Sequence, residues 1–282
     1  MRRLIRAIIG RPSIPSSEPI VLKSVQVQRS QQWLGHPFVL VPARDLRHVS
    51  EKTRELRSLG IDFLVVCGER SNDPAVRYRT SVGKWDAINH GSKFISSDSQ
   101  VVILNDVDTQ IHDLRLAFKH LNEADLIVCK VRVGSGPQKK FYRILDPIRR
   151  HFPIAASGEL MIMRREVLNR VMPIPPCTAE DSYIMFRAIE LGFRVKFVDE
   201  TFVTTERTTD SAQEQAYKIR TTLGIYQAMR LTHPPPQTRA FYLLLPVMAL
   251  ILAIGGPDGR AWAVGVERAT VLHLLKRYEE SF

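Results

Sequence analysis

Short apolar runs alternate with amphipathic stretches through the middle of the chain. The apolar runs have the length and composition of buried strands, and they cover residues 38–41, 61–67, 101–104, 125–131, 158–164 and 194–198. The stretches between them carry apolar residues at helical spacing, at residues 50–59, 84–95, 114–121 and 178–191. Strands that alternate with helices build right-handed βαβ units. We therefore expect an α/β domain over residues 37–232, with a Rossmann-like, mainly parallel sheet and flanking helices.

The two ends of the chain differ from this central part. Residues 1–36 begin with a basic and apolar stretch, and a linker rich in Pro and Ser follows. An amphipathic helix on an anionic membrane and a frayed basic terminus both fit this stretch. Residues 233–282 include the uncharged segment Phe241 to Pro257, which Pro246 and two glycines interrupt. That segment is short for a spanning helix.

We expect the C-terminal region to form a membrane-associated helical hairpin that dips into one leaflet on the cytoplasmic side of the cell membrane. A helix buried against the domain, or at an oligomer interface, is the alternative. The sequence does not indicate an oligomeric state.

The charge of the chain favours anionic partners. Its 282 residues include 40 Lys and Arg against 29 Asp and Glu, a formal net charge of +11. No interleaving of basic and aromatic residues and no zinc spacing supports nucleic-acid binding. Cys67, Cys129 and Cys177 are far apart and odd in number, so a reducing environment fits best.

Two carboxylates follow the apolar run at residues 101–104. Asp106 and Asp108 stand one residue apart, just beyond the end of the predicted strand. The carboxyl ends of parallel strands form the crevice in which open α/β sheets bind ligands. A hard cation such as Mg²⁺ binds there through one or two carboxylates together with substrate phosphates. A solvated turn is the structural alternative, because Asn and Asp are common turn residues.

The loops after the first, second and third predicted strands share one edge of a parallel sheet. Polar residues occupy each of these loops. We therefore expect a single crevice lined by Arg44, Asp45, Glu69, Arg70, Asp106 and Asp108.

The order of these segments resembles that of the family 2 glycosyltransferases with the GT-A fold. The resemblance rests on Pro42-Ala43-Arg44-Asp45, Cys67-Gly68-Glu69-Arg70, the segment from Gly83 to Gly91, Asp106-Val107-Asp108, the segment from Gly158 to Glu166, and Glu180-Asp181. It extends from about Phe38 to about Arg230. It implies an inverting enzyme that takes a sugar from a nucleotide-sugar donor with Mg²⁺ or Mn²⁺, and a glycan or lipid-linked acceptor.

The resemblance also implies roles for individual residues. Pro42, Ala43, Arg44 and Asp45 would contact the nucleotide, Glu69 its base or ribose, and Lys84 a phosphate or the base. Asp106 and Asp108 would hold the metal and the diphosphate, Asp181 of the Glu180-Asp181 pair would be the general base, and Lys218 and Arg220 would steady the leaving diphosphate.

The chain departs from the family pattern at two places. Cys67-Gly68-Glu69-Arg70 replaces the usual Asp-Gly-Ser, and no Gln-x-x-Arg-Trp signature of processive synthases is present. Transfer of a single sugar is therefore expected. The rivals are a non-catalytic, membrane-bound binding module on a degenerate GT-A fold, and a nucleotidyltransferase, whose glycine-rich loop after the first strand is missing here.

Overall fold

The computed structural model describes residues 36–278 except 136, 207–209 and 255. Residues 34–282 group into one compact unit, and the description below concerns that unit alone. The basic stretch and linker expected at residues 1–36 lie, apart from His36, outside the described residues.

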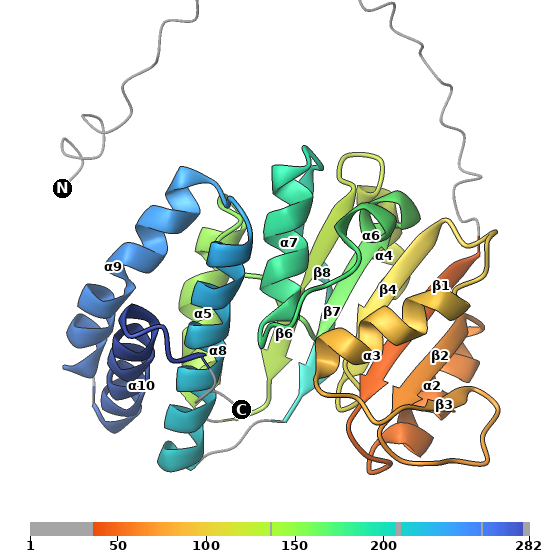
Figure 1. Cartoon of the computed structure of the whole chain (residues 1–282), viewed down its shortest axis with the longest axis horizontal. Helices are drawn as coiled ribbons and strands as arrows, with labels where there is room; N and C mark the ends of the chain where they lie inside the picture. Colours follow the sequence, from red (N-terminus) through yellow and green to blue (C-terminus); the bar gives the residue numbers. More distant parts are fainter. Residues whose placement is uncertain (1–35, 136, 207–209, 255, 279–282) are drawn as a thin grey trace, which may run out of the picture. The chain divides into compact units, whose positions relative to one another are not determined.

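All the predicted strands form, within a sheet of eight strands among the described residues (Figure 1). The sheet order is β3-β2-β1-β4-β7-β6-β8-β5. The strands are β1 (Pro37–Ala43), β2 (Asp62–Cys67), β3 (Val76–Tyr78), β4 (Val101–Asn105), β5 (Gln110–His112), β6 (Leu126–Val133), β7 (Leu160–Arg164) and β8 (Val195–Thr205). The short strands β3 and β5 were not predicted, because three residues carry too little pattern to be recognised.

Helices form at the four stretches predicted between the strands and in the C-terminal region. They are α2 (Val49–Leu59), α3 (Lys84–Gly91), α4 (Leu114–His120), α5 (Pro137–Arg149), α6 (Arg165–Val171), α7 (Glu180–Glu190), α8 (Ser211–Leu231), α9 (Pro236–Ala253) and α10 (Pro257–Leu274). The sequence pattern did not predict α5, which begins at Pro137.

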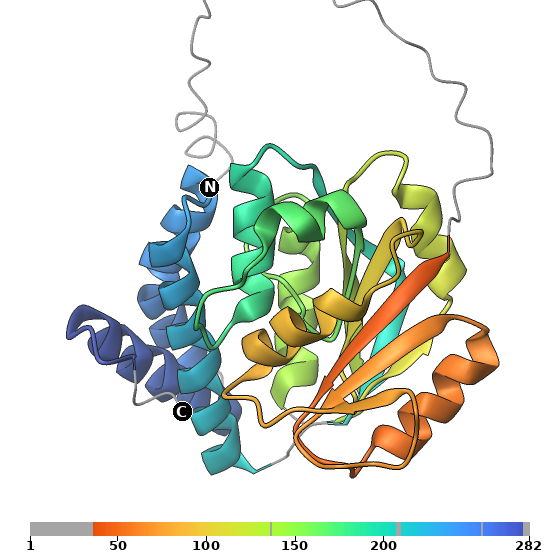
Figure 2. The ribbon, with the colours of Figure 1, turned by 45° about the vertical axis from the view of Figure 1, so that its right-hand side comes forward.

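Alternate residues of the strands face two separate hydrophobic cores. In β1, Leu40 faces the core that it shares with Ile88 of α3, and Val39 faces the core that it shares with Leu56 of α2. Side chains that point alternately to the two faces of a strand must both be apolar when helices cover both faces. This is why the strands read as continuous apolar runs. Figure 2 shows α3, α6 and α7 on one side of the sheet and α2 and α4 on the other.

The strand β7 changes the expected topology. Strands β1, β2 and β4 are parallel as predicted, and so are β6 and β8, and the unpredicted β3 is parallel to β2, but β7 runs antiparallel to both β4 and β6. The sheet is therefore mixed, with four parallel and three antiparallel pairings among the described strands. Asn105 at the end of β4 pairs with Leu160 at the beginning of β7. The segment that enters β7 thus lies beside the two carboxylates that follow β4.

The C-terminal region folds as two consecutive helices, α9 and α10. Both lie on the side of the domain where α8 is found, and α10 packs against α8 and α9 (Figure 1). No helix within the described part of the chain has both the length and the apolar character that crossing a bilayer requires. The dip into one leaflet stays a prediction.

Candidate active site

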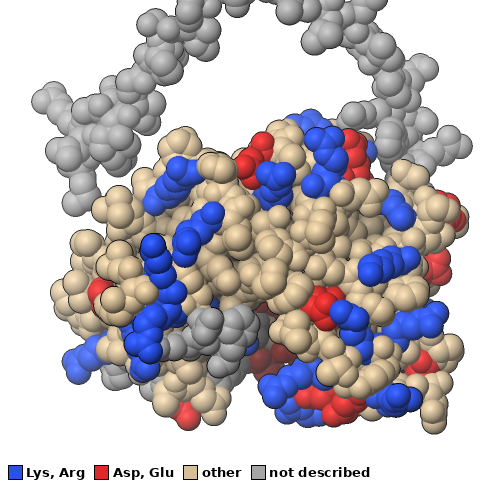
Figure 3. Space-filling view, viewed as in Figure 1, with Lys and Arg blue, Asp and Glu red and all other residues tan. Residues whose placement is uncertain are grey.

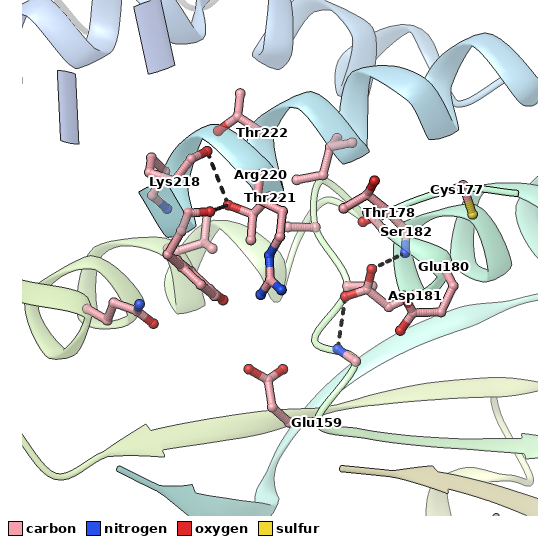
Figure 4. A pocket seen from close by; sticks show the side chains of 18 of the residues that line it. Glu159, Cys177, Thr178, Glu180, Asp181, Ser182, Lys218, Arg220, Thr221 and Thr222 are labelled. Atoms are coloured by element: carbon pink, nitrogen blue, oxygen red, sulfur yellow. Dashed lines mark hydrogen bonds between the residues drawn. The ribbon is translucent and has the colours of Figure 1, made fainter. Parts of the chain in front are cut away.

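A cavity of about 420 Å³ lies next to the carboxyl end of β4. Its walls come from the segments that flank β4 and β7 and from helices α3, α5, α7, α8, α9 and α10. One part of the lining is polar and charged, and includes Lys84, Asp106, Glu159, Glu180, Asp181 and Arg220. The structure therefore gathers most of the predicted catalytic and phosphate-binding residues around one space, part of which is drawn in Figure 4.

Lys84 connects the two acidic motifs. Its ammonium nitrogen lies 2.6 Å from Oδ1 of Asp106 and 2.8 Å from Oε1 of Glu180, and it donates a hydrogen bond to the carbonyl of Gly158 at 3.3 Å. Lys84 and Glu180 are each the first residue of a helix, α3 and α7. The two helix starts and the end of β4 thus meet at one ammonium group.

The charges of this cluster shift one another's protonation. Burial opposes the charge of Lys84, but the carboxylates of Asp106 and Glu180 outweigh it and hold the pKa of Lys84 well above its usual value. Burial raises the pKa of Glu180 to about 7, with Lys84 opposing the rise and Asp181 adding to it. The cluster is therefore a buried network in which each charge depends on the others.

Asp181 is held by backbone amides rather than by a cation. Its Oδ2 accepts a hydrogen bond from the Gly158 N–H at 2.9 Å, and its Oδ1 accepts one from the Ser182 N–H at 2.6 Å (Figure 4). A Cβ on Gly158 would lie 3.1 Å from Oδ2 of Asp181 and 3.0 Å from the Lys84 ammonium. Glycine at this position lets the chain approach both side chains. The predicted base thus has a fixed orientation beside the cavity.

Lys52 stabilises the turn that carries the two carboxylates by hydrogen bonds from its ammonium. This lysine of α2 is almost completely buried, and its ammonium donates to Oδ1 of Asn105 at 2.7 Å, to Glu55 at 2.7 Å and to the carbonyl of Thr109. Asn105 in turn donates to the hydroxyl of Thr109 at 2.9 Å. A buried amide and ammonium with several partners fix the path of the chain between Asn105 and Thr109.

Glu159 is a third acid at the carboxyl end of β4. It is buried and lines the cavity; its carbonyl accepts hydrogen bonds from the Asn105 side chain at 2.7 Å and from the Asp106 N–H at 3.2 Å. Burial raises the pKa of Asp106, Lys84 opposes that rise, and the charges of Glu159 and Asp108 add to it. Carboxylate oxygens therefore accumulate where the sequence predicts a cation.

The donor set at this edge suits a metal ion that is shared with a substrate. Among the described residues, no group of three or more His, Cys, Asp and Glu side chains is arranged to hold a metal ion. Asp106 and Asp108 offer oxygen ligands, which Mg²⁺ and Mn²⁺ prefer, and the mutual repulsion at Asp106 is of the kind that a dication relieves. Within the cavity, Asp106 therefore offers a carboxylate to an ion whose other ligands come from phosphates and water.

Asp106 and Asp108 face different spaces. Asp106 lines the cavity described above, whereas Asp108 is exposed and lines a second cavity of about 530 Å³ next to α2, with His48, Glu51 and Arg132. The single crevice expected from the sequence is thus divided by the turn at Asp106 to Thr109.

The two basic residues predicted on α8 both line the cavity but differ in their exposure. Arg220 is exposed at the mouth of the cavity, and Figure 4 shows its guanidinium pointing into the open space near Glu159 and Asp181. Lys218 is buried, with its ammonium 4.0 Å from the ring centre of Phe141 and 4.4 Å from that of Trp262. Burial lowers the pKa of Lys218 to about 7.

The predicted nucleotide-contacting segment borders the same edge of the sheet. Pro42 and Ala43 are buried within β1, whereas Arg44 is exposed beyond its end. Oε2 of Glu69 accepts a hydrogen bond from the Leu46 N–H at 3.2 Å, which ties the two loops together. A Cβ on Gly68 would lie 2.4 Å from the carbonyl oxygen of Arg44, so this close approach requires glycine.

Asp45 belongs to the same segment and is ion-paired with Arg47 at 2.8 Å. The hydrogen bonds from the Arg47 side chain and backbone lower the pKa of Asp45 to about 2. Pro42, Ala43, Arg44, Asp45 and Glu69 line neither of the two cavities. Their contact with a nucleotide stays a prediction.

Sequence reasoning gave no role to several residues of the site. Glu159 is an acid directly before an apolar strand, and this position could have marked it as a candidate site residue. Phe141 and Tyr142 were missed because α5 was not recognised, although apolar residues recur there at helical spacing. Lys52 and Trp262 carry no local signal, since only the packing of distant segments gives them their contacts.

Comparison with solved structures identifies the fold of the chain. No protein-family model matches the chain, and no curated protein matches its sequence. Among solved structures, GalNAc-T7 with UDP, GalNAc and Mn²⁺ superposes with a TM-score of 0.50 at 12% identity, over 86% of this chain and 54% of that chain. The chain has the GT-A fold.

Two other glycosyltransferases match less of the structure. Glucosyl-3-phosphoglycerate synthase from M. tuberculosis matches with a TM-score of 0.49 at 16% identity, over 68% of this chain and 80% of that chain. The catalytic domain of Drosophila β1,4-galactosyltransferase 7, crystallised with xylobiose, matches with a TM-score of 0.36 at 18% identity, over 57% and 64%. This chain thus spans only part of the length of several structures that it matches.

Proposed function

We propose that the protein is a glycosyltransferase of the inverting, family 2 type. It transfers a single sugar from a nucleotide-diphosphate sugar to a hydroxyl or lipid-linked acceptor. The observation that carries this proposal is the common cavity of Asp106, Asp181 and Arg220, which presents a carboxylate at the end of β4, a second carboxylate with a fixed orientation, and a cation. Family 2 membership and inversion are parts of the proposal.

The proposed reaction is one displacement at the anomeric carbon. The acceptor oxygen forms a bond to that carbon as the bond from the carbon to the diphosphate oxygen breaks, and the diphosphate leaves with the electron pair. Asp181 takes the proton of the acceptor hydroxyl. Attack from the face opposite the leaving group inverts the anomeric centre. A carboxylate whose orientation is set by the Gly158 and Ser182 amides is suited to meet an incoming hydroxyl.

Positive charge is needed where the diphosphate leaves. Asp106 and Asp108 would hold Mg²⁺ or Mn²⁺, which when bound neutralises charge that develops on the departing phosphates. Arg220 contributes a guanidinium at the mouth of the cavity, and guanidinium groups bind phosphate oxygens with two parallel hydrogen bonds. Lys84 stabilises Asp106 in its charged form. These groups would position the donor and assist its cleavage.

The proposal is tested by a screen of nucleotide sugars with Mg²⁺ or Mn²⁺, with and without acceptors, that measures released nucleoside diphosphate. With the nucleotide sugar, metal ion and acceptor that support turnover, Asp181→Asn should reduce turnover about 100- to 10,000-fold, because a general base contributes a factor of that order. Full turnover by Asp181→Asn would contradict the role as base, and would favour an acceptor whose attacking oxygen is already ionised, such as a phosphate.

A non-catalytic binding module is the second candidate. The observation in its favour is that the carboxylate of Asp106 already contacts the Lys84 ammonium, while the usual Asp-Gly-Ser segment is replaced by Cys67-Gly68-Glu69-Arg70. Calorimetry together with the release assay would distinguish the enzyme from the binding module. Binding of a nucleotide sugar without release of nucleoside diphosphate, whichever acceptor is added, would support the binding module.

Association with the cytoplasmic face of the cell membrane is also proposed. The outer face of α9 is apolar, with Leu243 and Leu250 80% and 57% exposed, and Ile254 just after the helix is 87% exposed. A surface of this kind marks contact with lipid or protein. Figure 3 shows basic side chains over the side of the domain on which α8 and α9 lie. Flotation of the intact protein with anionic vesicles tests the proposal, and a protein that stays entirely in the aqueous fraction would contradict it.

A further inference from the structure

The apolar part of the cavity lining differs from the charged part. Away from the charged cluster its lining is largely apolar and aromatic, and comes from α5, α8, α9 and α10, with Phe141, Leu145, Ile225, Phe241, Leu245 and Trp262. The buried ammonium of Lys218 also borders it, against the rings of Phe141 and Trp262. We call this part the apolar chamber. It is continuous with the space that Asp106 and Asp181 line, because all these residues border one cavity. An apolar group placed there would remove the surface of these walls from water.

The walls of the chamber include large apolar side chains that are only partly buried. Ile225 and Phe241 are only half-buried, although they are large and apolar, whereas Leu145 and Leu245 are 5% exposed. Half-buried apolar side chains that face a cavity are the surface that a ligand covers. The aromatic rings of Phe141 and Trp262 lie 4.7 Å apart at their centroids and both line the cavity.

The same helix that walls the chamber is also apolar on its outside. Along α9, Tyr242, Leu245 and Ala249 are buried inward, while Leu243 and Leu250 are largely exposed. A helix at the surface of a protein in water normally presents polar residues outward. Exposed arginines at Arg239 and Arg260 stand near the starts of α9 and α10. Basic residues beside an apolar helix face favour the surface of an anionic bilayer. Such a surface would lie one helix away from the chamber.

We propose that the acceptor is an amphiphile whose apolar chain lies in the chamber between α5, α8, α9 and α10, and whose head group reaches Asp181. This inference rests on the proposed function and defines the class of its acceptor. The head group carries a phosphate or a hydroxyl, since Arg220 would favour the former and Asp181 the latter. An acceptor drawn from a bilayer against α9 would have its reactive end at the donor and its chain in apolar surroundings throughout.

The test measures how binding depends on chain length. We would titrate the full-length protein with butyl, hexyl, octyl and decyl monophosphate below their micelle concentrations, by calorimetry, with inorganic phosphate as the chain-free reference. Affinity should rise with length by up to about fourfold per methylene until the chamber is full. The corresponding 1-alkanols separate the head groups: tighter binding of the phosphates identifies an anionic head, and equal binding identifies a hydroxyl.

Variants locate the binding within the molecule. Ile225→Trp fills the chamber and should abolish the dependence on chain length, whereas Leu231→Trp, at an exposed position at the end of the same helix, should leave it intact. Phe241→Ala enlarges the chamber and should shift the best chain to a longer one, which gives an independent result if Ile225→Trp does not fold. Leu243→Gln on the outer face of α9 should keep the dependence and weaken binding to anionic vesicles.

The outcomes distinguish this inference from the function on which it rests. Affinity that does not change with chain length, or a dependence that Ile225→Trp leaves unaltered, would overturn the inference. Tight binding of a soluble oligosaccharide that alkyl phosphates do not displace would do the same. Slow release of nucleoside diphosphate to water, measured without any acceptor, reports on the proposed function alone. Release without dependence on chain length would therefore keep the glycosyltransferase and reject the apolar acceptor.

Discussion

The ammonium of Lys84 lies 2.6 Å from the carboxylate of Asp106 and holds it beside Glu180, whose carboxylate is 2.8 Å from the same ammonium. A single cation thus links the end of β4 to the start of α7. Because Asp106 and Glu180 are both largely removed from water, their charges depend on this cation.

Replacement of Lys84 by Met should leave two neighbouring carboxylates without their common cation. We expect a loss of about 2–4 kcal/mol in the free energy of unfolding, somewhat below the usual effect of breaking a buried pair because the ammonium is partly exposed. Urea denaturation followed by tryptophan fluorescence measures it. The double variant Lys84→Met/Glu180→Gln should recover part of the loss, and no recovery would show that the two residues are not coupled.

Replacement of Lys52 by Met should disturb the turn that carries Asp106 and Asp108. The loss of three hydrogen bonds from a buried ammonium should lower the free energy of unfolding by about 2–4 kcal/mol and weaken binding of nucleotide with Mg²⁺. Lys119→Met, on the exposed face of α4, is the matched control and should change neither quantity. Unchanged nucleotide affinity in a folded Lys52→Met protein would show that the turn does not need this support.

Lys218 should make stability depend on pH in the alkaline range. Its pKa falls from 10.5 when unfolded to about 7 when folded, because burial disfavours the charge. Between pH 7 and pH 10.5 the folded state binds fewer protons than the unfolded state, so the free energy of unfolding rises with pH across this range. The stabilisation that comes with neutral Lys218 is fully present above pH 10.5 and is lost as pH falls toward 7. Lys218→Met should remove that slope and raise stability at pH 7 by roughly 1–3 kcal/mol, after the loss of contacts with Phe141 and Trp262. Denaturation curves at several pH values would show it, and an unchanged slope would contradict the burial of a charge here.

Arg220 should act on turnover rather than on stability. Its guanidinium is exposed and points into the mouth of the cavity, so Arg220→Gln should leave the free energy of unfolding within about 0.5 kcal/mol of the parent. Turnover should fall about 10- to 1000-fold if the guanidinium stabilises the leaving diphosphate. Arg230→Gln on the same helix, away from the cavity, should keep full turnover. Equal effects of the two substitutions would assign the loss to net charge.

The central part of the fold could be predicted from the sequence because strands buried on both faces leave a strong local signal. Continuous apolar runs such as Val101 to Leu104 require helices on both sides of the sheet, and the structure has them. Asp106 and Asp181 could be recognised as site residues for a related reason, since acids that follow an apolar strand or begin a helix stand at the ends of elements. Lys84 was predicted to be near phosphate, but its contact with Glu180 was not.

The tertiary structure alone decided how these parts meet. The direction of β7 is set by long-range pairing with β4 and β6, and no local pattern within Leu160 to Arg164 encodes it. That direction brings Gly158 and Glu159 to Asp106 and Asp181, and it completes the charged cluster. The apolar chamber likewise depends on the packing of α5, α9 and α10 around α8, which joins Phe141 to Trp262 across 121 positions. Local sequence determines which faces are apolar, but the contacts between distant faces come from burying them together.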